Sequence, residues 1–268
     1  MDNGAVGRNF SLHVGRYDRY RREVLAISRK LSAHGYFGTI SGTAGNVSML
    51  VPGEEAIAIT PTAMAYGAMK PEDICVVDFE LQRIAGARKP SIEAPMHVAA
   101  YRVRRDVNAV IHTHQICASA LGLIGESLPP LFDEVTLAIG AAAEVIPYAL
   151  SGTRELHERM AAALANRCHC YMIRNHGALC VGPDLGGTFT FVELLEKTAS
   201  IYLQALATGR PISRLPEAIA VKLFAEVKAR QDREIARKDA ALNNGARTGR
   251  NRRWPGRISL TNGGSRSG

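Results

Sequence analysis

The sequence predicts one α/β domain in which helices cover a mixed or antiparallel sheet. Short β-branched segments bounded by Gly and Pro indicate strands, and longer segments with apolar residues at helical spacing indicate helices. The two kinds do not alternate regularly as strand–helix–strand units, which argues against a purely parallel sheet. A chain of 268 residues with 46% hydrophobic and 22% charged residues can bury the core of such a domain.

The first part of the chain is expected to form a helix and then short strands. Residues 17–35 place apolar side chains near one helical face, and Gly35 supplies a stop. Residues 39–50 are β-branched at both ends with a Gly-rich middle, which favours a strand–turn–strand. Two further short strands are expected at 56–60 and 74–79.

The middle of the chain combines a helix with a buried strand. Pro90 precedes an expected helix at 91–105, which Ser91 can cap and in whose first turn Glu93 lies, where the helix dipole favours a carboxylate. The Val and Ile content of residues 107–114 predicts a buried strand. The remaining elements are expected as a helical turn at 115–123, a loop and a strand within 128–150, a helix at 153–166, strands at 171–175 and 178–181, and helices at 187–208 and 216–242. We expect a catalytic domain at 1–242 and a basic, Gly- and Arg-rich tail at 243–268.

Composition narrows the class of protein. The five cysteines are odd in number and irregularly spaced, so we expect free, mostly buried thiols rather than disulfides. The chain contains no apolar stretch of membrane-spanning length and no secretory signal, which predicts a cytoplasmic protein without membrane contact. The net charge of +8 is concentrated partly in the tail. A solvated tail is favoured over nucleic-acid binding, because no nucleic-acid-binding motif accompanies the charge.

The clearest chemical signal is His112-Thr113-His114 within the expected strand. Residues i and i+2 of a strand point to the same face, so the two imidazoles can bind one metal ion. Two histidines on a solvated strand face would give the same pattern. The apolar residues that precede them favour burial, which is costly for unpartnered imidazoles.

Other polar residues can complete such a site. His176 follows one apolar strand and precedes another, and three histidines with one open position are typical of catalytic metal sites. Glu93 can be a fourth ligand or an acid/base. His97 lies one helical turn after Glu93, where it can orient Glu93, contact substrate or serve the core. The turn that contains Gly42, Thr43, Gly45 and Asn46 can bind an anion through backbone amides, or can be a tight turn only.

Taken in order, these segments resemble the class II aldolase/adducin family. The matching stretches are SGTAGNVS (41–48), ITPTAMAYGAM (59–69), KPSIEAPMHVAAY (89–101), DVNAVIHTH (106–114), SGTREL (151–156) and NHGALCVG (175–182). Each stretch is weak alone, but the ordered set is specific. The resemblance implies a mainly antiparallel central sheet with helices on both faces, and a homotetramer with active sites between subunits.

The resemblance also implies roles for individual residues. It places one divalent metal ion per subunit, Mn or Zn, on His112, His114 and His176, with Glu93 as the acid/base. A small anionic substrate would be bound by Gly42, Thr43, Gly45 and Asn46, with Ser91 opposite.

Two departures from the pattern of the family's sugar-phosphate aldolases affect the expected reaction. Ile92 stands where a second phosphate-binding serine is usual, and Asp133 stands where a proton-donating tyrosine is frequent. Both departures resemble the family's decarboxylases. The sequence is therefore expected to encode a decarboxylase for a hydroxylated pyridine or aromatic dicarboxylate, such as 3-hydroxy-2-methylpyridine-4,5-dicarboxylate in vitamin B6 degradation. In that hypothesis the Gly-rich turn, together with Ser91 and Arg174, would hold the second carboxylate. The alternatives are a sugar-phosphate aldolase or epimerase, and a non-catalytic adducin-like binding module.

Overall fold

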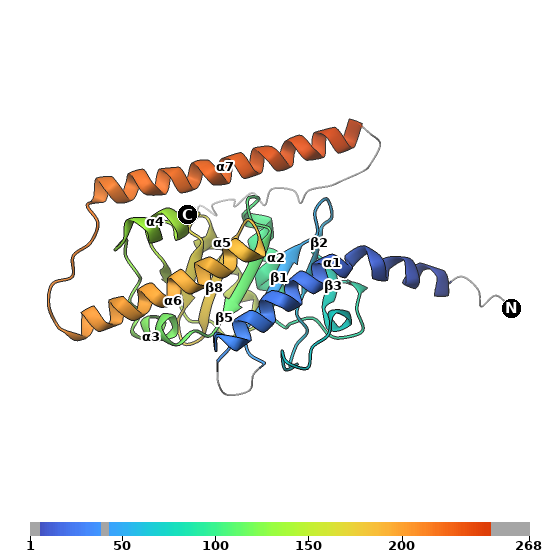
Figure 1. Ribbon diagram of the computed structural model, residues 1–268, viewed down its shortest axis with the longest axis horizontal. Coiled ribbons are helices and arrows are strands. Elements are labelled where there is room, and N and C mark those ends of the chain that lie inside the picture. Colours follow the sequence, from blue (N-terminus) through green and yellow to red (C-terminus); the bar gives the residue numbers. More distant parts are fainter. Residues whose placement is uncertain (1–5, 39–42, 248–268) are drawn as a thin grey trace, which may run out of the picture.

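The computed structural model describes residues 6–38 and 43–247. Seven helices and eight strands are present in this part of the chain (Figure 1). The helices are α1 (Val6–Ala33), α2 (Ala94–Val103), α3 (Ile116–Ile124), α4 (Asp133–Ile139), α5 (Arg154–Leu164), α6 (Leu185–Ala207) and α7 (Glu217–Arg247), with one turn of 3-10 helix at Pro71–Asp73. The strands are β1 (Asn46–Leu50), β2 (Ala56–Ile59), β3 (Cys75–Asp78), β4 (Arg83–Ala85), β5 (Ala109–Thr113), β6 (Glu144–Ile146), β7 (Cys170–Ile173) and β8 (Gly177–Gly182).

All eight strands form one sheet in the order β4-β3-β2-β1-β5-β8-β7-β6. Neighbouring strands are antiparallel except β6 and β7, which are parallel. The expected single α/β domain with a mainly antiparallel sheet is therefore confirmed. Strands β1, β5 and β8 lie at the centre of the sheet, so residues at the ends of these strands are held by hydrogen bonds on both sides.

The two faces of the sheet bury separate hydrophobic clusters. Helices α1, α3 and α6 cover one face, together with α4, and α2 and α5 cover the other. Strand β5 shows the alternation that creates the two clusters, because Ala109 and Ile111 face the first and Val110 faces the second. His112 follows the same alternation, and its side chain therefore lies on the face covered by α2.

The long helices follow from apolar residues at helical spacing. In α1, Tyr17, Val24 and Leu31 are buried at intervals of seven residues, which forms one continuous apolar seam. The helix begins well before the expected residue 17, and Gly35 follows it with a positive φ of 73°. Helix α7 packs against α4 and lies along one side of the body (Figure 1). It continues to Arg247, beyond the tail boundary expected at residue 243, and residues 248–268 lie outside the described part.

Several local expectations were wrong. The segment that forms α4 was expected to be a loop. The helix has only seven residues and its N-cap, Phe132, offers no side-chain hydrogen bond, so its sequence carries a weak helix signal. The three-residue strand β4 was not foreseen. The strand expected before the Gly-rich turn falls on residues 39–42, which lie outside the described part of the chain. Helix α2 begins at Ala94, so Glu93 is its N-cap rather than part of its first turn.

The cysteines and the lengths of the helices can also be compared with the expectations from the sequence. The five cysteines are free, and four of them are buried. The helices described here include none with the length and apolarity needed to cross a membrane.

Candidate active site

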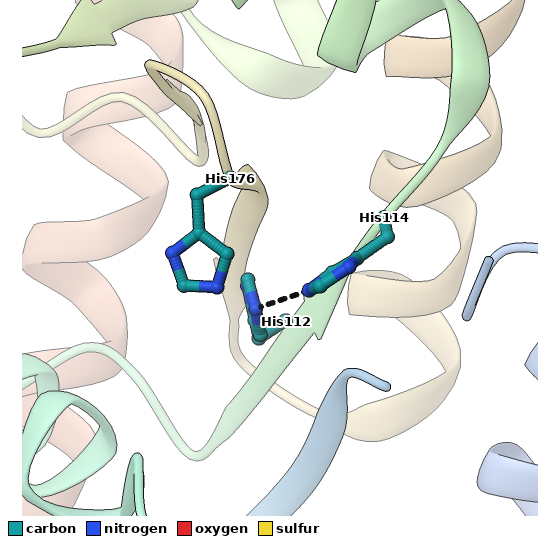
Figure 2. A group of neighbouring side chains, drawn as sticks. All are labelled: His112, His114 and His176. Atoms are coloured by element: carbon teal, nitrogen blue, oxygen red, sulfur yellow. Dashed lines mark hydrogen bonds between the residues drawn. The ribbon is translucent and has the colours of Figure 1, made fainter. Parts of the chain in front are cut away.

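The structure brings together the three histidines that the sequence singled out (Figure 2). His112 lies in β5, His114 follows directly after that strand, and His176 lies in the turn between β7 and β8. One ring nitrogen from each lies within 4.8 Å of the others. His112 is fully buried, whereas His114 and His176 are partly exposed, so the group opens toward solvent on one side.

Sheet register explains why residues so far apart in sequence meet. In the β5–β8 ladder His112 is opposite Leu179 and Thr113 is opposite Ala178, which places the turn before β8 beside the end of β5. Gly177 permits this close approach, because a Cβ atom built there would lie only 2.2 Å from the Thr113 carbonyl oxygen.

Glu93 lies against this group of histidines. Its Oε2 is 3.3 Å from His112 Nε2, and its Oε1 is 3.2 Å from His176 Nε2. Each carboxylate oxygen also accepts one hydrogen bond from a neutral donor. Asn46 Nδ2 donates to Oε2 at 2.8 Å, and the Ser151 hydroxyl donates to Oε1 at 2.8 Å. Each carboxylate oxygen is therefore held by one neutral donor while it lies close to a histidine.

The contact between Ser151 and Glu93 is not among those that the sequence predicts. Ser151 lies in the loop before α5, 58 residues from Glu93. The stretch SGTREL was recognised as a match to the family, but no role was assigned to its serine. The nearby Thr153, which caps α5 through its hydroxyl, gives the segment a purely local explanation that conceals the contact of Ser151.

The charges of the site follow from burial and proximity. Burial alone would raise the pKa of Glu93, but the neighbouring His112 and His176 and the hydrogen bond from Asn46 lower it below its usual value, so the group is a carboxylate. Burial lowers the pKa of His112 to about 3, although Glu93 opposes the shift. Burial also lowers the pKa of His114. Neutral imidazoles beside a carboxylate are the protonation states that a divalent cation requires of its ligands.

The donor geometry fits a metal ion. His112 donates its Nδ1–H to the Ala178 carbonyl oxygen at 2.8 Å, which leaves Nε2 as a lone-pair donor directed at the other histidines. The Nε2 atoms of His112 and His114 lie 3.0 Å apart (Figure 2). Three imidazoles with a carboxylate at their edge are a donor set that would hold Zn or Mn.

The Gly-rich turn lies next to the histidines, although Gly42 is outside the described residues. Gly45 has a φ of 71°, and a Cβ there would lie 2.3 Å from the Phe37 ring and 2.7 Å from the His112 carbonyl oxygen. The Tyr66 hydroxyl donates to the carbonyl oxygens of Ala44 and Gly45, at 3.2 and 2.7 Å. Thr43 is half-buried at the start of this turn.

Ser91 stands at the start of the segment that carries Glu93. Its backbone amide donates to the Thr60 carbonyl oxygen at 3.0 Å, and its hydroxyl accepts from the Glu93 amide at 3.2 Å. The hydroxyl hydrogen is not needed for that bond and can be donated to a ligand. Ser91 does not cap α2, in contrast to the expectation.

The three further candidates have different surroundings. His97 is fully buried and contacts Asn46 and Ser48. Asp133 is exposed at the first turn of α4. Arg174 is exposed, and its guanidinium lies over Gly125, where a built Cβ would meet Nη2 at 2.0 Å. Among the described contacts, none joins Asp133 or Arg174 to Glu93 or the three histidines.

Comparison with known proteins identifies the family. Residues 22–203 match the model of the Class II Aldolase and Adducin N-terminal domain, and the chain therefore belongs to this family. The match runs from the C-terminal part of α1 to most of α6, and it includes all three histidines of the site.

Named relatives are sugar-phosphate aldolases. The chain is 32% identical over 197 residues to 5-deoxy-D-ribulose 1-phosphate aldolase of Bacillus thuringiensis serovar kurstaki, covering 74% of this chain and 90% of that protein. It is 35% identical over 187 residues to L-fuculose phosphate aldolase of Escherichia coli K12, covering 69% and 85%. A solved L-fuculose 1-phosphate aldolase superposes with a TM-score of 0.72 at 30% identity, covering 78% of this chain and 96% of that one.

Proposed function

We propose that this protein is a metal-dependent lyase that cleaves a small sugar 1-phosphate by a retro-aldol reaction. The observation that carries the proposal is the Glu93 carboxylate held against His112 and His176, at 3.3 and 3.2 Å, where it can exchange protons with a molecule bound by the histidines. The names of the relatives favour the aldolase over the decarboxylase, which reverses the order of the two hypotheses drawn from the sequence.

The site's own residues account for the proton transfers. Zn or Mn bound by His112, His114 and His176 would supply a Lewis acid that polarises substrate oxygens and stabilises negative charge during carbon–carbon cleavage. Glu93 removes the proton of the hydroxyl group on the carbon that becomes the aldehyde. The bond to the neighbouring carbon then breaks, and its electron pair remains on the ketone fragment. Glu93 can return the proton to that fragment, so the products are an aldehyde and a keto phosphate, without oxidant or reductant.

The turn beside Glu93 and the Ser91 hydroxyl offer hydrogen-bond donors to an anion, which supports our proposal of a phosphorylated substrate. The Tyr66 hydroxyl occupies the carbonyl oxygens of Ala44 and Gly45, which favours presentation of backbone amides by the turn. Ser91 retains a hydroxyl hydrogen that it can donate. We assign the phosphate to Gly42, Thr43, Gly45, Asn46 and Ser91.

The rim next to Glu93 is apolar, which agrees with a deoxy sugar as substrate. Ile92 is 64% exposed and Leu150 is 63% exposed, and the Ile92 side chain lies beside Gly152. Ile92 directly precedes Glu93, and Leu150 directly precedes Ser151, which contacts Glu93. Both apolar residues therefore adjoin the site.

Decarboxylation is the second candidate, and Ile92 and Asp133 are the observations that favour it. Neither supplies the serine hydroxyl or the tyrosine acid that is usual in the family's sugar-phosphate aldolases. A solved relative, YgbL of Klebsiella pneumoniae, is described as an aldolase, epimerase or decarboxylase. It superposes with a TM-score of 0.68 at 28% identity, covering 76% of this chain and 97% of that one.

The experiment compares both substrate classes on the metal-loaded protein. L-Fuculose 1-phosphate and 5-deoxyribulose 1-phosphate should release dihydroxyacetone phosphate, measured by coupled reduction, without CO2. Chelation or His112→Ala should reduce the rate at least 1000-fold and reduce the bound metal to below one ion per chain. Release of CO2 from 3-hydroxy-2-methylpyridine-4,5-dicarboxylate without aldol cleavage would establish the decarboxylase instead. A purified protein without stoichiometric metal, unchanged by His112→Ala, would indicate a binding module.

A further inference from the structure

A continuous chain of hydrogen bonds runs from the core beneath α2 to Glu93. The Tyr101 hydroxyl lies 2.8 Å from Ser48 Oγ, which lies 2.7 Å from His97 Nδ1. His97 Nε2 lies 2.5 Å from Asn46 Oδ1, and Asn46 Nδ2 lies 2.8 Å from Glu93 Oε2. None of the five side chains belongs to the triad of histidines, and all are at most 5% exposed.

Only one direction of donation satisfies every member of this chain. The Glu93 carboxylate can only accept, so Asn46 must present its amide nitrogen to Glu93 and its amide oxygen to His97. His97 Nε2 must then carry the hydrogen. Burial lowers the pKa of His97 to about 3, so the ring is neutral and its Nδ1 must accept. Ser48 therefore donates to His97, and Tyr101 donates to Ser48.

Reversing the side-chain amide of Asn46 would remove the hydrogen bond to Glu93. If the amide were reversed, its oxygen would face the Glu93 oxygen and two acceptors would repel each other at 2.8 Å. An apolar residue in place of His97 would leave the buried Asn46 oxygen without its donor and would release the amide to rotate. The order of donors and acceptors in the chain therefore determines, through Asn46, that an N–H donor faces the Glu93 carboxylate.

We propose that Tyr101, Ser48 and His97 are positioning residues that fix the orientation of Asn46 and thereby hold Glu93 in its working position. This role rests on the proposed function of Glu93 as the acid/base. The three residues do not contact substrate. They act by keeping His97 in the tautomer with hydrogen on Nε2, and Asn46 with its amide nitrogen toward Glu93.

The tautomer is testable without any activity. Nitrogen-15 spectra of the metal-loaded protein labelled at histidine should show His97 as a neutral ring with hydrogen on Nε2 and a lone pair on Nδ1, assigned by difference with His97→Gln. A hydrogen on Nδ1 would overturn the proposal, whatever reaction the enzyme performs.

Kinetics separate positioning from simple core packing. His97→Leu should lower kcat at least tenfold, with KM and bound metal within twofold of wild type. In His97→Gln the side-chain amide can donate to Asn46 and accept from Ser48, so it should restore most of kcat. Equal losses in the Leu and Gln variants would contradict the proposal.

A milder variant covers the case in which His97→Leu does not fold. Tyr101→Phe keeps the ring and removes only the first donor of the chain. It should lower kcat three- to tenfold with an unchanged KM. An unchanged kcat in Tyr101→Phe would also contradict the proposal. An absence of aldol cleavage in the wild-type protein would refute the proposed function, while the spectra would still decide the order of the chain.

Discussion

At the residue scale, the site is organised by how Glu93 is held. Its two oxygens face different histidines, and each has one neutral donor, Asn46 for one oxygen and Ser151 for the other. The two donors differ in their surroundings. Asn46 is buried and is fixed by His97, whereas Ser151 lies on an exposed loop and can be changed without disturbing the core.

Ser151→Ala should reduce kcat at least about tenfold, because a hydrogen bond to a charged group contributes about 1.5–3 kcal/mol and its loss frees one side of the carboxylate. Ser151→Thr retains the hydroxyl and should recover most of the rate. Steady-state kinetics on the metal-loaded protein measure both. Thr153→Ser, which keeps the cap of α5, is the matched control in the same loop. A wild-type kcat in Ser151→Ala would show that Asn46 alone fixes Glu93.

How far the sequence could predict the site depends on the kind of contact. His112 and His114 were predictable because strand alternation is local, and His176 because it lies between two recognisable strands. Ser151 was not predictable, because its partner is 58 residues away and depends on how the loop before α5 lies over α2. For the fold, long elements with clear periodicity were found, and α4 was missed because packing against α6 and α7 stabilises a helix too short to have a strong pattern.

At the element scale, α3 shows a face that the described chain leaves uncovered. Ile116, Leu123 and Ile124 are 73%, 59% and 63% exposed, and spacings of seven and eight residues place them on one side of the helix. Three large apolar side chains on one exposed face are typical of an interface. We therefore propose that α3 contributes to the contacts of a homotetramer.

Light scattering after size-exclusion chromatography should give four times the mass of one chain, which is 28.9 kDa. The double change Leu123→Glu and Ile124→Glu should lower the mass to a dimer or monomer, since charged side chains oppose burial in an apolar contact. Val221→Glu on α7, where Val221 is 62% exposed, is a control of equal exposure and should leave the mass unchanged. A wild-type monomer would refute the assembly, and an unchanged mass in the double variant would place the interface elsewhere.

At the scale of the whole molecule, α7 is tied to the sheet by polar contacts that depend on pH. Gln231 of α7 donates to the Arg167 carbonyl oxygen at 2.9 Å and to His169 Nε2 at 3.0 Å. His169 donates its Nδ1–H to the Val181 carbonyl oxygen at 2.8 Å, so its Nε2 must accept. Protonation of His169 would place two donors against each other, which couples the charge of this ring to the attachment of the helix.

This coupling predicts a loss of stability in mild acid. Burial, together with the positive charge of Arg104, lowers the pKa of His169 to about 4. The folded state thus disfavours a proton that the unfolded chain binds below its ordinary pKa of 6.5. The contribution of His169 to stability is therefore fully present above pH 6.5 and is lost as the pH falls from 6.5 to about 4. A shift of this size corresponds to at most about 3 kcal/mol.

Urea unfolding between pH 4 and pH 8 measures this effect. The free energy of unfolding of the wild-type protein should fall with decreasing pH across this window. In His169→Gln it should fall less steeply, because the amide can replace the donor and acceptor of the imidazole but does not titrate. Other buried histidines, among them His97, contribute the same slope to both proteins, so the difference between the two curves isolates His169. Parallel curves would show that His169 is protonated at the same pH in the folded and unfolded chains, and that α7 is attached independently of its charge.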